Sequence, residues 1–261
     1  MKMNMNDHFD MKIKLEDIKV SFGLKKVLDG VNLEYVGEGI YAIIGVNGTG
    51  KSVLMKSIAG IQTYSGKVSI TNCKKICQKE DIAYVPQVTS LNSSLTSFEM
   101  VLLGKVNHLK MRVSDEMVKE VYEVMERLNI RSLEEQTFSS LSGGQKQLII
   151  MAQALISKPK LLLLDEPTSA LDLYHQLNLL SLARQYCKET GAITIVIMHD
   201  LSQAARFCKR ITILKDGKVF AYGKPQEVLT EINIKEVFKV DAEIGFSNSG
   251  YTTVQPVAIS V

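Results

Sequence analysis

The most informative segment of the chain reads Gly45-Val46-Asn47-Gly48-Thr49-Gly50-Lys51-Ser52. Its glycine, lysine and serine positions fit a phosphate-binding loop, whose backbone N–H groups point at the anion. Such a loop needs a strand before it and a helix after it. The apolar residues 40–44 suit a strand buried on both faces, and residues 52–59 have helical spacing and stop at Gly60. We therefore expect a nucleoside triphosphate here, with Lys51 reaching the β- and γ-phosphates and Ser52 ligating Mg²⁺.

A second motif follows the apolar residues 161–164, where Asp165 and Glu166 stand side by side. A buried strand that ends in a carboxylate can hold that carboxylate beside a metal ion. Because the phosphate loop lies upstream, Asp165 is predicted to bind Mg²⁺ and Glu166 to orient or deprotonate the attacking water. Adjacent side chains at a strand end point in different directions, so the two carboxylates can take these separate roles.

A third motif, Leu141-Ser142-Gly143-Gly144-Gln145, stands between the other two. Ser142 is a good helix cap, and the glycines expose backbone amides at the positive end of a helix predicted to run to Leu155. This geometry also binds anions, although the phosphate loop already supplies one such site.

In this order the three motifs resemble those of the ATPase subunit of ATP-binding-cassette (ABC) systems. The resemblance covers residues 11–243 and implies an α/β fold, a P-loop ATPase with a RecA-like core, an antiparallel β subdomain and an inserted α-helical subdomain. It also implies a homodimer that encloses two ATP molecules with Mg²⁺. In that dimer, one subunit presents its signature residues to the γ-phosphate held by the other; these residues are Ser142, Gly143, Gly144 and Gln145.

Further positions match the family one by one. Phe22 corresponds to the aromatic residue that stacks on adenine, and Gln87 to the glutamine that touches Mg²⁺ and joins the core to the insert. Asp172 belongs to the loop that crosses to the other subunit, and His199 corresponds to the histidine that contacts the γ-phosphate. The resemblance therefore implies Glu166 and His199 as catalytic residues. The implied metal ligands are Ser52, Gln87 and Asp165. The implied nucleotide contacts of the loop are Gly45, Asn47, Gly48, Thr49, Gly50, Lys51, Ser52 and Val53.

Several segments narrow the resemblance to the importer branch that serves iron–siderophore, haem and cobalamin uptake. They are residues 102–105, 172–176, 199–206, 223–229 and 237–243. This branch implies an integral-membrane permease as partner, with an extracytoplasmic substrate-binding protein acting indirectly. The segment between Ile70 and Ile82 is shorter than this branch usually has, which leaves the cargo open, and an importer for another small solute is the alternative.

Composition limits the other functions. Hydrophobic residues make up 46% and charged residues 23% of the 261, and a net charge of +3 gives no strong basic excess for nucleic acid. No apolar run reaches the ~18–20 residues of a membrane-spanning helix, and the polar start lacks the apolar core of a signal peptide. We therefore expect the chain at the cytoplasmic face of the cell membrane, attached through the permease. The four cysteines have no paired zinc spacing and are expected to be reduced thiols.

The pattern predicts one domain with flanking segments. We expect a flexible extension over residues 1–11, an ATPase domain over residues 12–243 and a C-terminal tail over residues 244–261, with the helical insert at about residues 88–158. Two rival functions belong to other classes of protein. A non-transport relative acting on DNA or the ribosome carries a long coiled coil or a second cassette, and this sequence has neither. A regulatory ATP-binding module often lacks the counterpart of Glu166 or His199, and both are present.

Overall fold

The structure is a computed structural model that describes residues 11–73, 75–87, 92–108 and 113–260. The flexible extension expected at the start of the chain lies outside these residues, with one exception. Met11 is the first residue of strand β1 and is buried, so the folded part begins one residue earlier than expected.

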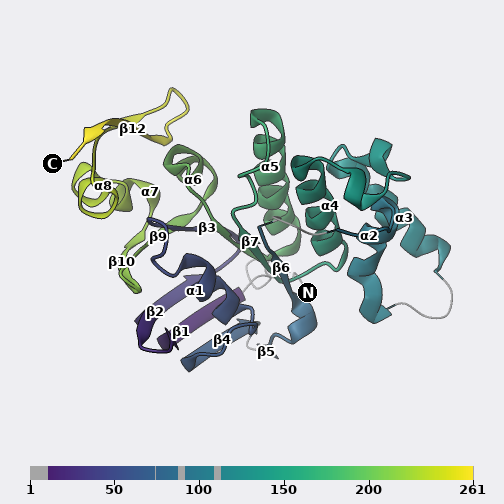
Figure 1. Cartoon of the computed structure of the whole chain (residues 1–261), viewed down its shortest axis with the longest axis horizontal. Helices are drawn as coiled ribbons and strands as arrows, with labels where there is room; N and C mark the ends of the chain where they lie inside the picture. Colours follow the sequence, from purple (N-terminus) through teal and green to yellow (C-terminus); the bar gives the residue numbers. More distant parts are fainter. Residues whose placement is uncertain (1–10, 74, 88–91, 109–112, 261) are drawn as a thin grey trace, which may run out of the picture.

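A six-stranded sheet forms the centre of the molecule, with the strand order β10-β9-β3-β8-β7-β6 (Figure 1). Its strands are β3 (Gly39–Ile44), β6 (Ile82–Val85), β7 (Leu161–Asp165), β8 (Ile193–Ile197), β9 (Arg210–Lys215) and β10 (Lys218–Gly223). All neighbours are parallel except β9 and β10, which form a hairpin. The hairpin turns at Asp216 and Gly217, both with positive φ, as a tight two-residue turn requires.

A second, antiparallel sheet has the order β2-β1-β4-β5 and lies beside α1 in Figure 1. Its strands are β1 (Met11–Phe22), β2 (Lys25–Val36), β4 (Ser65–Asn72) and β5 (Lys75–Ile76). Strand β1 alternates buried and accessible residues over most of its length, as one-sided packing demands. The antiparallel β subdomain expected from the family resemblance is therefore present.

Two hydrophobic cores cover the opposite faces of the central sheet. On one face, Tyr41 and Ile43 of β3 pack with helix α1 (Lys51–Ile58) and the antiparallel sheet. On the other face, Ile40 and Ala42 pack with three helices, whose bounds are given below. Alternate residues of one strand point to opposite faces, so a strand covered on both sides must be apolar throughout.

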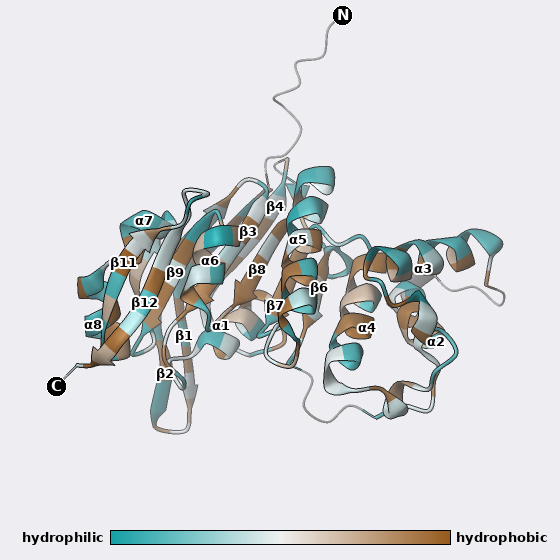
Figure 2. Cartoon of the chain, turned by 90° about the horizontal axis from the view of Figure 1, so that it is seen from above, coloured by the Kyte–Doolittle hydropathy of each residue, from teal (hydrophilic) through white to brown (hydrophobic). Residues whose placement is uncertain are grey.

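Helices α4 (Gly143–Ile156), α5 (Leu173–Thr190) and α6 (Leu201–Phe207) cover the second face, and α4 also belongs to the helical insert. The insert further holds α2 (Ser97–Leu102), η2 (Leu103–His108), α3 (Asp115–Arg127), η3 (Arg131–Leu133) and η4 (Phe138–Ser140). Val121 and Met125 of α3 pack into the same core as Met151 of α4. Figure 2 shows the insert at one end of an elongated molecule, and its described residues fall within the expected range.

The opposite end of the molecule holds α7 (Pro225–Val228), α8 (Glu231–Phe238) and the hairpin of β11 (Val240–Phe246) and β12 (Thr252–Ile259) (Figure 2). A short helical turn, η1 (Lys79–Asp81), precedes β6. The boundary expected between residues 243 and 244 falls inside β11. The segment expected as a C-terminal tail therefore contains the end of β11 and all of β12.

One side chain ties this hairpin to the sheet helices. The Ser202 hydroxyl on α6 accepts a hydrogen bond from the Val254 N–H at 3.1 Å and donates to the Val254 carbonyl oxygen at 3.4 Å. Ala242 and Ile244 contribute apolar contacts to the main core from the same hairpin. The hairpin is thus docked on α6 by this hydroxyl and by apolar contacts, and Lys235 of α8 forms an ion pair with Asp241 of β11 at 2.9 Å.

We expect Ser202→Ala to loosen β12, because the Val254 N–H loses its acceptor. A lost hydrogen bond is worth about 1 kcal/mol, so amide exchange in residues 252–259 should rise about fivefold. Ser181→Ala on the exposed side of α5 is the matched control. Equal exchange rates in both variants would show that the hydroxyl does not hold the hairpin.

Candidate functional site

The candidate residues gather at one edge of the central sheet, where four parallel strands end. The register pairs Ile43 of β3 with Ile197 of β8, Ile197 with Asp165 of β7, and Leu164 of β7 with Val85 of β6. The phosphate loop follows β3, His199 follows β8, Glu166 follows β7 and Gln87 follows β6. Ligands of open α/β sheets bind outside the carboxyl ends of such strands.

The phosphate loop has the backbone shape that its glycines permit. Gly50 caps α1 with a φ of 97°, and a Cβ there would lie 2.8 Å from the Leu28 side chain and 2.9 Å from the Val27 carbonyl oxygen. Only glycine fits this position without strain, since L side chains rarely adopt positive φ. The loop therefore directs the amide groups of the α1 N-terminus into the space before it.

Lys51 is buried, and its Nζ donates to the carbonyl oxygens of Gly45 and Val46, each at 2.9 Å. Burial lowers the pKa of Lys51, while the nearby carboxylates of Glu166 and Asp165 oppose the shift. Thr49 is also buried and donates to the Val46 carbonyl oxygen at 2.9 Å. A cation held against its own loop can turn to a phosphate without leaving the site.

A pair of oxygen donors stands where a metal is expected. The Ser52 hydroxyl donates to Asp165 Oδ1 at 3.0 Å, and the Asp165 carboxylate is 5% exposed. Hydroxyl and carboxylate oxygens suit Mg²⁺, which takes few protein ligands and completes its shell with water and phosphate. The residues present therefore fit Mg²⁺.

Tyr84 is a contact that the sequence reasoning missed. Its hydroxyl donates to Asp165 Oδ2 at 3.0 Å, so both carboxylate oxygens of Asp165 are held. Burial and the adjacent carboxylate raise the pKa of Tyr84 well above its usual range, which keeps the phenol a donor. Nothing in the Tyr84-Val85-Pro86-Gln87 segment signals this role, because it depends on β6 lying next to β7.

Glu166 is joined to the two other strand ends. Its Oε1 lies 2.7 Å from His199 Nε2, and its Oε2 accepts a hydrogen bond from the Gln87 amide at 3.2 Å. Glu166 has a φ of 50°, in the left-handed region that residues other than glycine adopt infrequently. This turn after β7 lets Asp165 face the metal donors while Glu166 faces His199.

A hollow of about 540 Å³ opens in front of these groups. Its lining includes ten of the residues expected from the sequence, namely Phe22, Asn47, Gly48, Gly50, Lys51, Ser52, Val53, Gln87, Glu166 and His199. Phe22 is 53% exposed and joins Lys25 and Val27 at the rim, so its ring is free to meet a base. Gly45, Thr49 and Asp165 lie behind this lining, and Lys25 and Val27 are additions that carry no motif signal.

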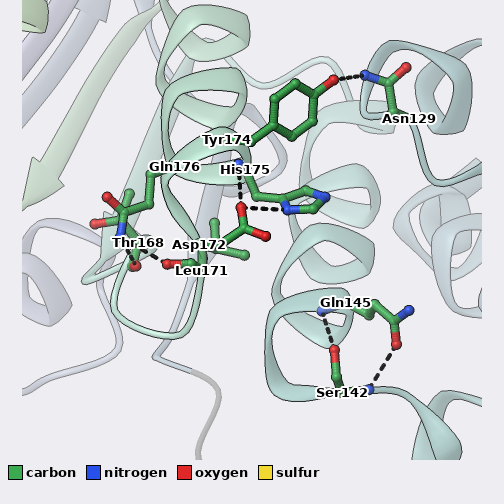
Figure 3. Close-up of polar contacts among 9 residues, drawn as sticks. All are labelled: Asn129, Ser142, Gln145, Thr168, Leu171, Asp172, Tyr174, His175 and Gln176. Atoms are coloured by element: carbon green, nitrogen blue, oxygen red, sulfur yellow. Dashed lines mark hydrogen bonds and ion pairs between the residues drawn. The ribbon is translucent and has the colours of Figure 1, made fainter.

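The signature residues lie in a different hollow, of about 430 Å³. Ser142 caps α4 by accepting from the Gln145 N–H at 3.3 Å, while the Gln145 side chain accepts from the Ser142 N–H at 2.9 Å (Figure 3). Gly143, Gly144 and Asp172 line the same hollow, together with His175, which the sequence reasoning did not single out. Within one chain, the phosphate loop and the signature therefore belong to separate sites.

Comparison with known proteins gives the family. Residues 28–169 match the ABC transporter family. The chain is 35% identical over 240 residues to the iron(3+)-hydroxamate import ATP-binding protein FhuC of Bacillus subtilis, covering 89% of each chain. It is 34% identical over 243 residues to the hemin import ATP-binding protein HmuV of Shewanella denitrificans, with 88% of this chain and 94% of that protein covered.

A solved structure agrees with the sequence matches. A metal-chelate type ABC transporter in an inward-facing conformation superposes with a TM-score of 0.81 at 27% identity, covering 95% of this chain and 98% of that one. The expected fold class is thereby confirmed, as is the resemblance to this importer branch. The chain belongs to the ABC transporter family and is the subunit that binds and hydrolyses ATP.

Proposed function

We propose that this ATPase subunit powers the import of a metal chelate through a membrane permease. The support comes from relatives whose names specify iron(3+)-hydroxamate and hemin import, and from the metal-chelate type transporter. Cobalamin, the third cargo of this branch, rests on the sequence segments alone. Among the described residues, no helix combines the length and the apolar character that a membrane span requires.

The separation of the two hollows supports an ATP site that is shared between two copies of the chain. One hollow holds the phosphate loop and Glu166, and the other holds Ser142 at the N-terminus of α4. A triphosphate in the first hollow needs further donors on its open side, and a second copy can bring its signature there. Two copies arranged head to tail would then share two ATP sites, each built from both chains.

The chemistry assigned to each site is in-line attack of water on the γ-phosphate. Lys51 and the amides of α1 would hold the phosphates, and Glu166 would orient or deprotonate the water. The His199 side chain would exchange its contact with Glu166 for one with the γ-phosphate, and it would stabilise the negative charge there. Ser52, Gln87 and Asp165 would hold Mg²⁺, which neutralises phosphate charge when it is bound.

A groove of about 530 Å³ between core and insert suits a short helix of the permease. Ile82, Ala83 and Tyr84 of the β6 segment form one wall, and Ile150 and Gln153 of α4 form the other. From the sequence, we expect such a groove near residues 87–103. Residues 88–91 of that range lie outside the described chain, and the described lining falls on both sides of it.

Glu166→Gln should retain MgATP binding and slow hydrolysis by about a hundredfold or more, because the amide cannot take a proton from water. Slow turnover should also let a closed dimer accumulate with ATP, visible by size-exclusion chromatography. Glu126→Gln on the exposed face of α3 is the matched control. Parental hydrolysis by Glu166→Gln in the presence of its permease would remove Glu166 from the mechanism.

Ser142→Arg should block hydrolysis while each subunit still binds nucleotide, because the bulky cation fills the second hollow and leaves the first intact. Mixing it with Glu166→Gln before adding ATP gives a sharper measurement. Half of the dimers would be mixed and each would hold one intact site, so activity should return to roughly a quarter of the parental value.

Ser132→Arg, an exposed position in η3, controls for the added charge. A mixture that stays as inactive as its two components, although subunits exchange, would argue against shared sites. Normal turnover by Ser142→Arg alone would do the same.

The cargo is tested with the permease that copurifies with the chain. Cells expressing both should accumulate radioactive iron supplied as a ferric hydroxamate or as haem, and the Glu166→Gln variant should abolish this uptake. Uptake of neither chelate, together with Glu166-dependent uptake of another class of solute, would overturn the cargo assignment and leave the ATPase assignment standing.

A further inference from the structure

Two of the importer-branch segments, residues 172–176 and 199–206, meet in the structure. The reaction scheme uses only His199 from them. Gln203 on α6 donates through Nε2 to Gln176 Oε1 on α5 at 2.8 Å. Gln176 in turn donates through Nε2 to the carbonyl oxygens of Leu171 at 2.9 Å and Thr168 at 3.2 Å (Figure 3). Two side-chain amides therefore connect α6 to the loop before α5.

The direction of this chain of hydrogen bonds is fixed by chemistry. Carbonyl oxygens only accept, so the nitrogen of Gln176 must face Thr168 and Leu171. The oxygen of Gln176 then faces Gln203, which must present its own nitrogen. A carboxylate at position 176 would keep the partner at 203 and lose both bonds to the loop.

Each end of the connection lies at a functional element. The loop of residues 168–172 borders the signature hollow through Ala170, Leu171 and Asp172. At the other end, the Gln203 N–H donates to Asp200 Oδ1 at 2.8 Å, which caps α6 directly after His199. The first ATP hollow and the second hollow of one chain are thus joined through polar contacts.

The first turn of α5 makes two further contacts, shown in Figure 3. The Tyr174 hydroxyl accepts from the Asn129 side-chain amide of the helical insert at 3.2 Å. His175 Nδ1 lies 2.8 Å from Asp172 Oδ1, and this carboxylate also accepts from the His175 N–H. This turn therefore contacts the loop, the insert and α6 within three consecutive residues.

Packing alone does not account for a glutamine at both position 176 and position 203. Gln203 Oε1 is buried and has no hydrogen-bond partner among the residues that the structure describes. A buried polar atom without a partner is unfavourable, and an apolar side chain at this position would avoid it. The bond from Gln203 to Gln176 is the contact that a glutamine provides and an apolar residue cannot.

We propose that Gln176 is a positioning residue for the shared ATP site. Its side-chain amide holds residues 168–172 in the conformation that faces the second copy. Through its bond to Gln176, Gln203 couples this conformation to the position of α6, the helix that follows His199. The inference rests on the proposed dimer and adds to it a physical link between the two ATP sites. Neither glutamine lines the ATP hollow, so neither is assigned a contact with nucleotide.

The test uses Gln176→Glu, a substitution of nearly equal size that loses both bonds to the loop. MgATP binding by separate subunits should keep its Kd, because no residue of the ATP hollow changes. The kcat should fall about tenfold, as expected for one or two lost hydrogen bonds. In a Glu166→Gln background, the ATP concentration that gives half-maximal dimer should rise by a similar factor.

The Gln203→Leu variant removes the hydrogen bond between Gln203 and Gln176 and leaves the bonds from Gln176 to the loop in place. Alone it should lower kcat by about threefold, and added to Gln176→Glu it should lower kcat no further, because the path is already broken. If the double variant instead lost kcat by the product of the two single-variant factors, the link to α6 would be overturned. If Gln176→Glu folds poorly, the kcat of Gln203→Leu alone still tests the proposal.

Gln185→Ala is the matched control, since this glutamine lies on the same helix and its amide donates to the exposed Glu189 at 2.7 Å. Parental kcat and parental dimer formation in both Gln176→Glu and Gln176→Ala would overturn the proposal. A lowered melting temperature with unchanged kcat and dimer formation would assign Gln176 a structural role only. A parental protein that neither dimerises nor hydrolyses MgATP would instead overturn the proposed function.

Discussion

The parallel register of β3, β8, β7 and β6 is the constraint on which the site depends. It brings four strand ends to one edge, so that segments far apart in sequence contribute to one cluster. The Ser52–Asp165 and Glu166–His199 contacts join three of these ends directly. A strand displaced by one residue would turn its terminal side chain to the other face. The apolar cores on both faces therefore fix the chemistry as well as the stability.

Much of this arrangement could be predicted from the sequence because its signals are local. Each motif is one short continuous segment, and its residue types determine its local backbone conformation. The motifs are the phosphate loop, the strand that ends in Asp165 and the helix cap at Ser142. Their order along the chain gave the family, and the comparisons confirmed it. The roles of the individual site residues remain predictions, although the structure places them in the two groups described above.

The parts that were missed depend on tertiary neighbours. Tyr84 reaches Asp165 only because β6 lies beside β7, and Gln176 meets Gln203 only because α5 packs near α6. The segment expected as a C-terminal tail contains Pro256, a residue that is uncommon within strands. The structure accommodates Pro256 in a two-stranded hairpin, next to a register shift between Asp241 and Ala242. Periodicity contains no information on such pairings.

The central claim is that one copy of the chain does not complete an ATP site by itself. The most direct measurement is the hydrolysis rate per subunit across a dilution series at saturating MgATP, with the mass of the particles recorded at each concentration. The account predicts that the specific activity falls in step with the fraction of dimer. A specific activity that stays constant down to concentrations where every particle is a monomer would contradict it.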